Sequence, residues 1–190
     1  MNKKQNPNIP YSRPSITDLE AHYASDAARN GWGDQCYGYI NRFEELFKQH
    51  LGVEYAIATS SCTGALHMGM AALDVGPSDE VIMADTNWIA TCSPVIALGA
   101  KPVFVDCDDT FCMDVNKIED VITEKTKAIL PVHFTGYMVD MKKLMIIGKN
   151  YNLPIIEDAC QGILASQNNK NAGTWGETGC FSLHPLKNLN

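Results

Sequence analysis

The sequence predicts an α/β fold of three layers, in which helices cover both faces of a mostly parallel sheet. Short apolar runs of strand length alternate with segments of helical periodicity along most of the chain, and this alternation is typical of parallel sheets. The 190 residues, 45% of them hydrophobic and 19% charged, are also enough for one sizeable domain with its own core.

The N-terminal part is expected to form an arm and a helix. Residues 1–14 are polar and contain three prolines, which predicts an extended arm. A helix is expected at residues 15–29, with Ser15 or Thr17 as its cap. The Gly-Trp-Gly turn that follows is interpreted as a chain reversal, and a substrate contact by Trp32 is the alternative.

A candidate phosphate-binding turn follows a second helix. Apolar residues at helical spacing predict that helix at residues 39–51, and a short buried strand is expected at 55–58. The run TSSCTG at 59–64 then leads into a helix at 65–73. Backbone N–H groups and the positive end of the helix dipole meet at such a turn. The alternative is a capping sequence without a ligand, because Ser and Thr cap helices of every kind.

Strands and helices alternate through the middle of the chain. We expect strands at residues 80–84, 102–106, 128–133 and from 153 onward, and helices at 85–98, 115–122 and 141–149. A polar run at 166–173 predicts a surface hairpin. No GxGxxG motif follows any strand, which gives a dinucleotide site little support. His133, at a strand end, is either a core imidazole or part of a pocket floor.

Two polar side chains that follow apolar runs indicate chemistry. Asp158 ends an apolar strand, and Lys187 follows an FSLH run at 181–184 that is interpreted as a strand. A desolvated lysine can act as a nucleophile, and a carboxylate can keep a pyridine nitrogen protonated. Pyridoxal 5'-phosphate requires these two groups from a protein. Gln161 is placed to stabilise the phenolate oxygen of that ring by hydrogen bonding.

The runs IEDACQ at 156–161 and FSLHPLKN at 181–188 closely resemble the signature of the DegT/DnrJ/EryC1/StrS sugar aminotransferases. Similar motifs occur in the same order at residues 59–66, 99–106 and 131–136. The resemblance implies a pyridoxal-phosphate enzyme of the aspartate aminotransferase fold, in which Lys187 is the catalytic residue and also holds the cofactor. It implies further that Trp88 stacks on the pyridine ring, whereas core packing is the alternative for a single tryptophan.

The phosphate of this cofactor is assigned to three donors. They are the backbone amides of Cys62 and Thr63 and the hydroxyl of Ser182. His67, in the helix after the turn, is interpreted as a packed residue and not as a catalytic one.

The resemblance also implies a longer protein. Family members continue past the lysine motif into a second, smaller domain, and they act as homodimers in which each subunit contributes to the neighbouring site. We therefore expect an N-terminal arm and helix at residues 1–33, a partial cofactor-binding large domain at 34–190 and a missing C-terminal domain. The expected function is amino transfer from glutamate to a nucleotide-linked keto sugar, such as a 4-keto-6-deoxyhexose of surface polysaccharides. The alternative is a non-catalytic remnant or one half of a split enzyme.

Composition argues against several other classes. A net charge of −7 and a pI near 5.1 argue against nucleic-acid binding. No apolar run reaches the length of a membrane span, and the N-terminus lacks the apolar core of a signal peptide, so a cytoplasmic protein is expected. The seven cysteines lack CxxC spacing and are interpreted as small, mostly buried side chains, not as a disulfide framework or a zinc site.

Overall fold

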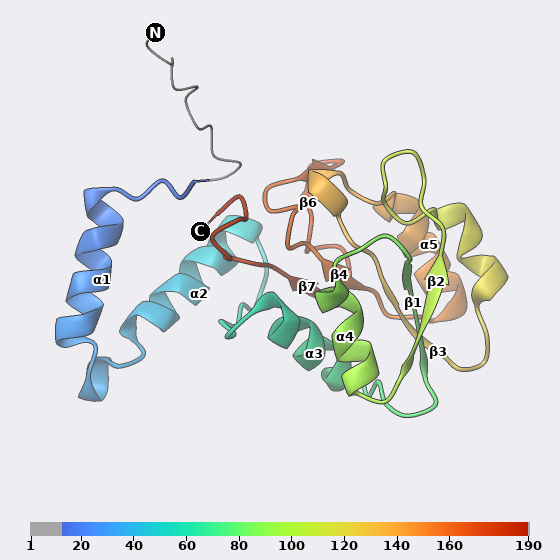
Figure 1. The fold of residues 1–190 in the computed structure, drawn as a ribbon, viewed down its shortest axis with the longest axis horizontal. Coiled ribbons are helices and arrows are strands. Elements are labelled where there is room, and N and C mark those ends of the chain that lie inside the picture. Colours follow the sequence, from blue (N-terminus) through green and yellow to red (C-terminus); the bar gives the residue numbers. More distant parts are fainter. Residues whose placement is uncertain (1–12, 190) are drawn as a thin grey trace, which may run out of the picture.

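The computed structural model describes residues 13–189, in which helices and short strands alternate (Figure 1). Its α-helices are α1 (Asp18–Asn30), α2 (Gly38–Leu51), α3 (Cys62–Ala72), α4 (Ile89–Ala97) and α5 (Met141–Tyr151). Its strands are β1 (Glu80–Ala84), β2 (Lys101–Val105), β3 (Thr126–Leu130), β4 (Ile156–Asp158), β5 (Ser166–Gln167), β6 (Lys170–Asn171) and β7 (Thr178–Cys180). Short 3-10 turns lie between them: η1 (Gly33–Gln35), η2 (Val115–Lys117), η3 (Glu119–Val121) and η4 (Phe134–Gly136).

The parallel strands lie side by side in the order β2-β1-β3-β4-β7. β1 pairs in parallel with β2 and β3, and β4 pairs in parallel with β7. Two parallel bridges, Ile129 with Ile155 and Val132 with Asp158, connect the segment that contains β3 to the segment that contains β4. The carboxyl ends of these strands therefore lie along one edge. β5 and β6 form a separate antiparallel hairpin, as predicted for residues 166–173.

Helices cover both faces of this sheet. α3 and α4 contact each other on one face, and α5 lies on the other (Figure 1). Every residue of β1 is buried, as expected for a central strand of a parallel sheet. α5 contributes Met141, Leu144 and Ile147 to the core. The predicted three-layer α/β/α fold is confirmed.

The two N-terminal helices lie apart from the core (Figure 1). Neither α1 nor α2 contains a buried residue. The hydroxyl of Tyr39 donates a hydrogen bond to Asp26 at 2.6 Å and connects the two helices. The ring of Phe47 meets that of Phe181 edge-on, with 5.1 Å between centroids, and this contact connects α2 to the rest of the chain.

Local capping explains where the first helices begin and end. The side chain of Thr17, one of the two predicted caps, forms a capping box with Glu20 at the start of α1. α2 ends at Gly52, whose φ of 68° is left-handed and suits glycine. α3 begins at Cys62 and not at residue 65, because the side chain of Ser61 caps it.

The predicted strand at 55–58 is wrong. The segment is irregular, and Tyr55 and Ile57 are 77% and 70% exposed. A strand needs a hydrogen-bonded neighbour, and none of the described strands pairs with this segment. The N–H of Ala58 instead donates to the side chain of Glu44 at 2.7 Å.

Two further predictions are corrected. Residues 115–122 form two successive 3-10 turns and no α-helix, because Asp114 caps the first turn and the extended Ile122 ends the second. The strand expected at 181–184 lies earlier, at β7, whose register with β4 ends where Asp158 faces Cys180. The arm predicted at residues 1–14 falls mostly outside the described residues.

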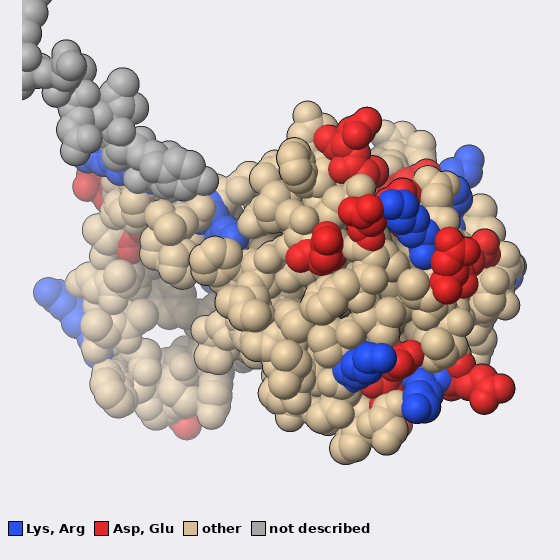
Figure 2. Space-filling model, turned by 45° about the vertical axis from the view of Figure 1, so that its right-hand side comes forward, with Lys and Arg blue, Asp and Glu red and all other residues tan. Residues whose placement is uncertain are grey.

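Charged side chains are scattered over the face shown in Figure 2. Acidic and basic side chains intermingle, and a wide uncharged area covers the centre of the body. A nucleic-acid interface needs clustered lysines and arginines, and this face shows no such cluster. Within residues 13–189, no helix has the length and apolar character needed to cross a membrane.

Backbone segments pack very closely around Gly179 in β7. A Cβ atom at Gly179 would lie 2.0 Å from the carbonyl oxygen of Gly173, whereas one at Gly76 would meet nothing within 4 Å. We expect Gly179→Ala to lower the free energy of unfolding by about 3 kcal/mol, because backbone must move to accommodate the methyl group. Gly76→Ala is the control and should change it by less than about 0.5 kcal/mol. Urea denaturation measures both, and equal midpoints for the two variants would contradict this account.

Candidate functional site

Asp158, the last residue of β4, is the centre of the candidate site. Its side chain is almost fully buried, at 2% exposure. The hydroxyl of Thr91 in α4 donates to its Oδ2 at 2.8 Å, and the N–H of Cys160 donates to its Oδ1 at 3.1 Å. The thiol sulfur of Cys62, at the start of α3, lies 3.9 Å from Oδ1. Three segments distant in the sequence therefore converge on one carboxylate.

The groups that hydrogen-bond to Asp158 are neutral. They are a hydroxyl, a backbone amide and a thiol. The ion pairs found within residues 13–189 join other residues. Burying a carboxylate without a cationic partner costs free energy. The site therefore favours a ligand that brings a positive group, and a protonated ring nitrogen, the partner predicted for Asp158, fits this requirement.

The start of α3 presents two backbone N–H groups. The hydroxyl of Ser61 accepts from the N–H of Gly64 at 3.1 Å, and the carbonyl of Ser61 accepts from the N–H of Ala65 at 3.0 Å. The N–H groups of Cys62 and Thr63 make no hydrogen bond within the described part of the chain. Together with the positive end of the helix they suit an anion, as predicted for the cofactor phosphate.

Gln161 and Ser182 both keep donor groups available. The Oε1 of Gln161 accepts from the N–H of Thr135 at 2.7 Å, which leaves the side-chain amide N–H groups to donate elsewhere. The hydroxyl oxygen of Ser182 accepts from the N–H of His184 at 3.3 Å, so its own O–H can donate. Both side chains are half-buried. Each can therefore perform the donor role that the sequence predicts.

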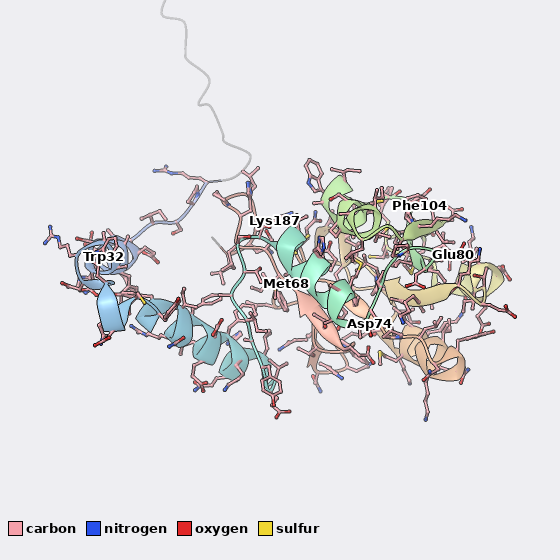
Figure 3. All side chains as sticks on the ribbon, turned by 90° about the horizontal axis from the view of Figure 1, so that it is seen from below. Trp32, Met68, Asp74, Glu80, Phe104 and Lys187 are labelled. Atoms are coloured by element: carbon pink, nitrogen blue, oxygen red, sulfur yellow. The ribbon has the colours of Figure 1, made fainter. Side chains whose placement is uncertain are left out.

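The remaining predicted residues lie in different surroundings. Trp88 is the N-cap of α4 and is 69% exposed, which excludes core packing. Lys187 is half-buried, and its backbone N–H donates to the carbonyl of His184 at 2.7 Å. Figure 3 shows Trp32 far from Lys187 and α3, at the end of the N-terminal helices. The structure thus does not bring Trp32 to this site. His67 is exposed on α3, so the prediction that it is packed is wrong.

Glu157, which precedes Asp158 in β4, is a structural centre that the sequence analysis missed. It accepts hydrogen bonds from three backbone N–H groups, those of Gly173, Trp175 and Gly176. The Nε2 atom of His133 lies 2.9 Å from its carboxylate. The N–H of Val139 donates to Nδ1 of His133 at 3.4 Å, which assigns the imidazole proton to Nε2. His133 is therefore a satisfied core imidazole, which decides between the two alternatives.

The sequence profile of the DegT/DnrJ/EryC1/StrS aminotransferase family matches residues 14–190. The chain belongs to this family. The resemblance inferred from the motifs at 156–161 and 181–188 is confirmed.

The chain matches only part of the length of individual relatives. The uncharacterised protein MJ1066 of Methanocaldococcus jannaschii is 38% identical over 182 residues, which cover 95% of this chain and 47% of the relative. The UDP-4-amino-4-deoxy-L-arabinose–oxoglutarate aminotransferase of Shewanella sediminis is 37% identical over 185 residues, 95% of this chain and 46% of the relative. The chain spans about half the length of these relatives.

Solved structures of the family share the fold. Spr1654 of Streptococcus pneumoniae, described as a sugar aminotransferase and solved in its PLP form, matches with a TM-score of 0.88 and 31% identity. The match covers 96% of this chain and 50% of that protein. Spr1654 has also been solved in its PMP form, and NtdA of Bacillus subtilis has been solved with bound PMP. The predicted cofactor of this family, pyridoxal phosphate, is therefore confirmed.

Two thiols near Asp158 are held in the protonated form. Burial, together with the charge of Asp158, raises the pKa of Cys180 to about 12. A hydrogen bond with Cys160, followed by burial and the Asp158 charge, raises the pKa of Cys62. A nucleophilic cysteine needs a lowered pKa, so neither thiol is activated for attack at neutral pH. All seven cysteines are free.

The raised pKa of Cys180 predicts a loss of stability at alkaline pH. The unfolded thiol ionises near its ordinary pKa of 9.0, whereas the folded thiol ionises at about 12. Its contribution to stability is complete below pH 9 and is lost as the pH rises toward 12. We expect the free energy of unfolding to fall in this window by about 1.4 kcal/mol per pH unit from this group alone.

Denaturant titrations between pH 8 and pH 11 measure this slope. Cys180→Ala should make it shallower, because the variant lacks the thiol that loses its proton on unfolding. Cys36→Ala is the control, since Cys36 is exposed, and should leave the slope unchanged. A slope that is the same in all three proteins would refute the assignment to Cys180.

Proposed function

We propose that this chain forms the cofactor-binding part of a pyridoxal-phosphate aminotransferase that acts on a nucleotide-linked keto sugar, with glutamate as the amino donor. The observation that carries the proposal is the buried Asp158 carboxylate, whose hydrogen-bond donors in the described part of the chain are all neutral. It lies at the same edge of the sheet as the free amides of Cys62 and Thr63. One end of this site thus suits a cation and the other an anion.

Each residue of the site has a part in holding the cofactor. Asp158 would keep the ring nitrogen protonated, and the amides of Cys62 and Thr63 would bind the phosphate. When bound, pyridoxal phosphate supplies the electron sink for the carbon that loses a proton. The hydroxyl of Ser182 would add a phosphate donor, and Gln161 would donate to the phenolate oxygen.

Trp88 and Lys187 would act on the faces and the reacting end of the ring. The exposed indole of Trp88 offers a flat surface for stacking, which excludes water from one side. Lys187 would hold the cofactor covalently and, once released, would move a proton between the α-carbon of the donor and the C4' atom.

The substrate class rests on the relatives. One relative is a UDP-4-amino-4-deoxy-L-arabinose–oxoglutarate aminotransferase and another is described as a sugar aminotransferase. We extend this to a keto sugar linked to a nucleotide, such as a 4-keto-6-deoxyhexose used for surface polysaccharides. The oxoglutarate in the first name supports glutamate as the donor, because glutamate becomes 2-oxoglutarate when it gives up its amino group.

The proposal includes an assembly larger than one chain. We infer that residues 34–190 form a partial large domain, that further polypeptide completes it, and that the functional unit is a homodimer. Exposed apolar side chains near the site support this, since Trp88, Ile89 and Met68 are 69%, 68% and 51% exposed. A non-catalytic remnant, or one half of a split enzyme, is the competing outcome in the experiment below.

Lys187 and Asp158 are tested with the purified chain and pyridoxal phosphate. We expect a visible absorption band, and borohydride reduction should trap the cofactor on the peptide that contains Lys187. Lys187→Ala should abolish trapping. Lys170→Ala is the control and should leave trapping unchanged, because Lys170 lies in the surface hairpin, over the ring of Trp175. Trapping on another lysine would contradict the assignment.

Amino transfer itself is followed by adding glutamate to the loaded protein. The visible band should shift as the amino group moves to the cofactor, and Asp158→Asn should slow this shift by roughly 10²-fold or more, as removal of one stabilising group does elsewhere. A band that never responds to glutamate would favour the remnant or split-enzyme alternative. A colourless protein would contradict the proposal for this chain.

A further inference from the structure

Thr91 is a buried polar side chain that the sequence analysis assigns no role. It is 1% exposed and lies in the first turn of α4. Its hydroxyl donates to Oδ2 of Asp158 at 2.8 Å, across 67 positions of sequence. The donor must be the hydroxyl, since an ionised carboxylate can only accept.

The position of Thr91 in its helix leaves the hydroxyl free for this long-range bond. A threonine deeper in a helix often bonds back to the carbonyl four residues earlier. For Thr91 that carbonyl belongs to Asn87, which precedes α4 and lies outside the helix. The branched side chain limits χ1 of a helical threonine to two main rotamers, and Thr91 adopts one that directs its hydroxyl to Asp158.

The bond to Thr91 sets how the Asp158 carboxylate can rotate. Within residues 13–189, Oδ1 receives the N–H of Cys160 and the thiol of Cys62, and Oδ2 receives only the hydroxyl of Thr91. A carboxylate has about four acceptor positions, so Oδ2 retains one. With both oxygens held, the direction of this remaining lone pair is fixed before any ligand arrives.

The same turn of α4 also carries Trp88. The N–H of Thr91 donates to the carbonyl of Trp88 at 2.9 Å. Thr91 thus binds Asp158 through its side chain and Trp88 through its backbone. A flat ring that met Asp158 at its edge and Trp88 at its face would be oriented by both contacts together.

We propose that Thr91 is a positioning residue for the pyridine ring of the cofactor. It touches no ligand itself; it fixes the Asp158 carboxylate toward the ring nitrogen and holds the start of α4, from which Trp88 projects. The inference rests on the proposed function, because it presupposes that the chain binds pyridoxal phosphate.

The test compares Thr91→Val, which keeps the shape and loses the donor, with Thr91→Ser, which keeps the donor. We expect Thr91→Val to bind pyridoxal phosphate roughly tenfold to a hundredfold more weakly. Thr91→Ser should stay within about threefold of the parent protein, well below the effect of losing a hydrogen bond to a charged group. Titration of the apo-protein measures the dissociation constants.

A second readout separates positioning from general support of the fold. With pyridoxal phosphate labelled with ¹⁵N in the ring, the nitrogen signal reports whether the ring is protonated. We expect a protonated signal for the parent and Thr91→Ser, and a shift toward the unprotonated signal for Thr91→Val. Thr123→Val is the matched control: the hydroxyl of Thr123 donates to Glu80 at 2.7 Å, away from this site. It should lower the melting temperature but leave the dissociation constant and the ¹⁵N signal unchanged.

The outcomes distinguish this inference from the proposed function. A parent protein that does not bind pyridoxal phosphate overturns both. A parent that binds, together with a Thr91→Val variant of equal affinity and equal ¹⁵N signal, overturns the role of Thr91 alone. Should Thr91→Val not fold, Thr91→Cys replaces it as a weak donor of similar size. Its dissociation constant should exceed that of Thr91→Ser, and the reverse order overturns the inference.

Discussion

The hydrogen bonds accepted by two adjacent carboxylates in β4 hold this part of the molecule together. Successive side chains of a strand point to opposite faces, and Glu157 and Asp158 accordingly meet different partners. Glu157 accepts three backbone N–H groups from the loop before β7 and faces the imidazole of His133. Asp158 accepts donors from α3, from α4 and from the turn after β4. The first carboxylate is saturated by the protein, whereas the second keeps capacity for a ligand.

The helices on the Asp158 side serve both the fold and the site. α3 and α4 contact each other on one face of the sheet, and each begins at the edge where the strands end. Capping by Ser61 satisfies the third and fourth N–H groups of α3 and leaves the first two available. The capping geometry found at the start of an ordinary helix therefore also produces an anion site, and no additional residues are needed for it.

Much of the fold could be predicted from sequence because its signals are local. Alternating periodicities gave the parallel sheet, and Thr17 and Gly52 mark helix ends by their own chemistry. The segment at 55–58 shows where local pattern misleads: its apolar residues suit a strand, but a strand depends on a neighbour that no short window reveals. The same holds for residues 181–184, where the register with β4 decides which residues pair.

The site divides in the same way. Asp158, Gln161 and the turn at Cys62 could be found because they lie within contiguous motifs at strand ends. Thr91 and His133 could not be assigned, because their roles depend on bonds that span 67 and 24 positions. For Trp32 the structure does not support the alternative of a substrate contact, because the fold places this exposed residue far from the site.

The absence of buried residues in α1 and α2 has a consequence for how this chain tolerates change. The pair is attached through a few side-chain contacts, such as the aromatic pair of Phe47 and Phe181. Local opening of such helices costs far less than global unfolding. Substitutions on the outer surfaces of α1 and α2 should therefore change the free energy of unfolding little. Substitutions at the carboxyl edge of the sheet should lower it directly.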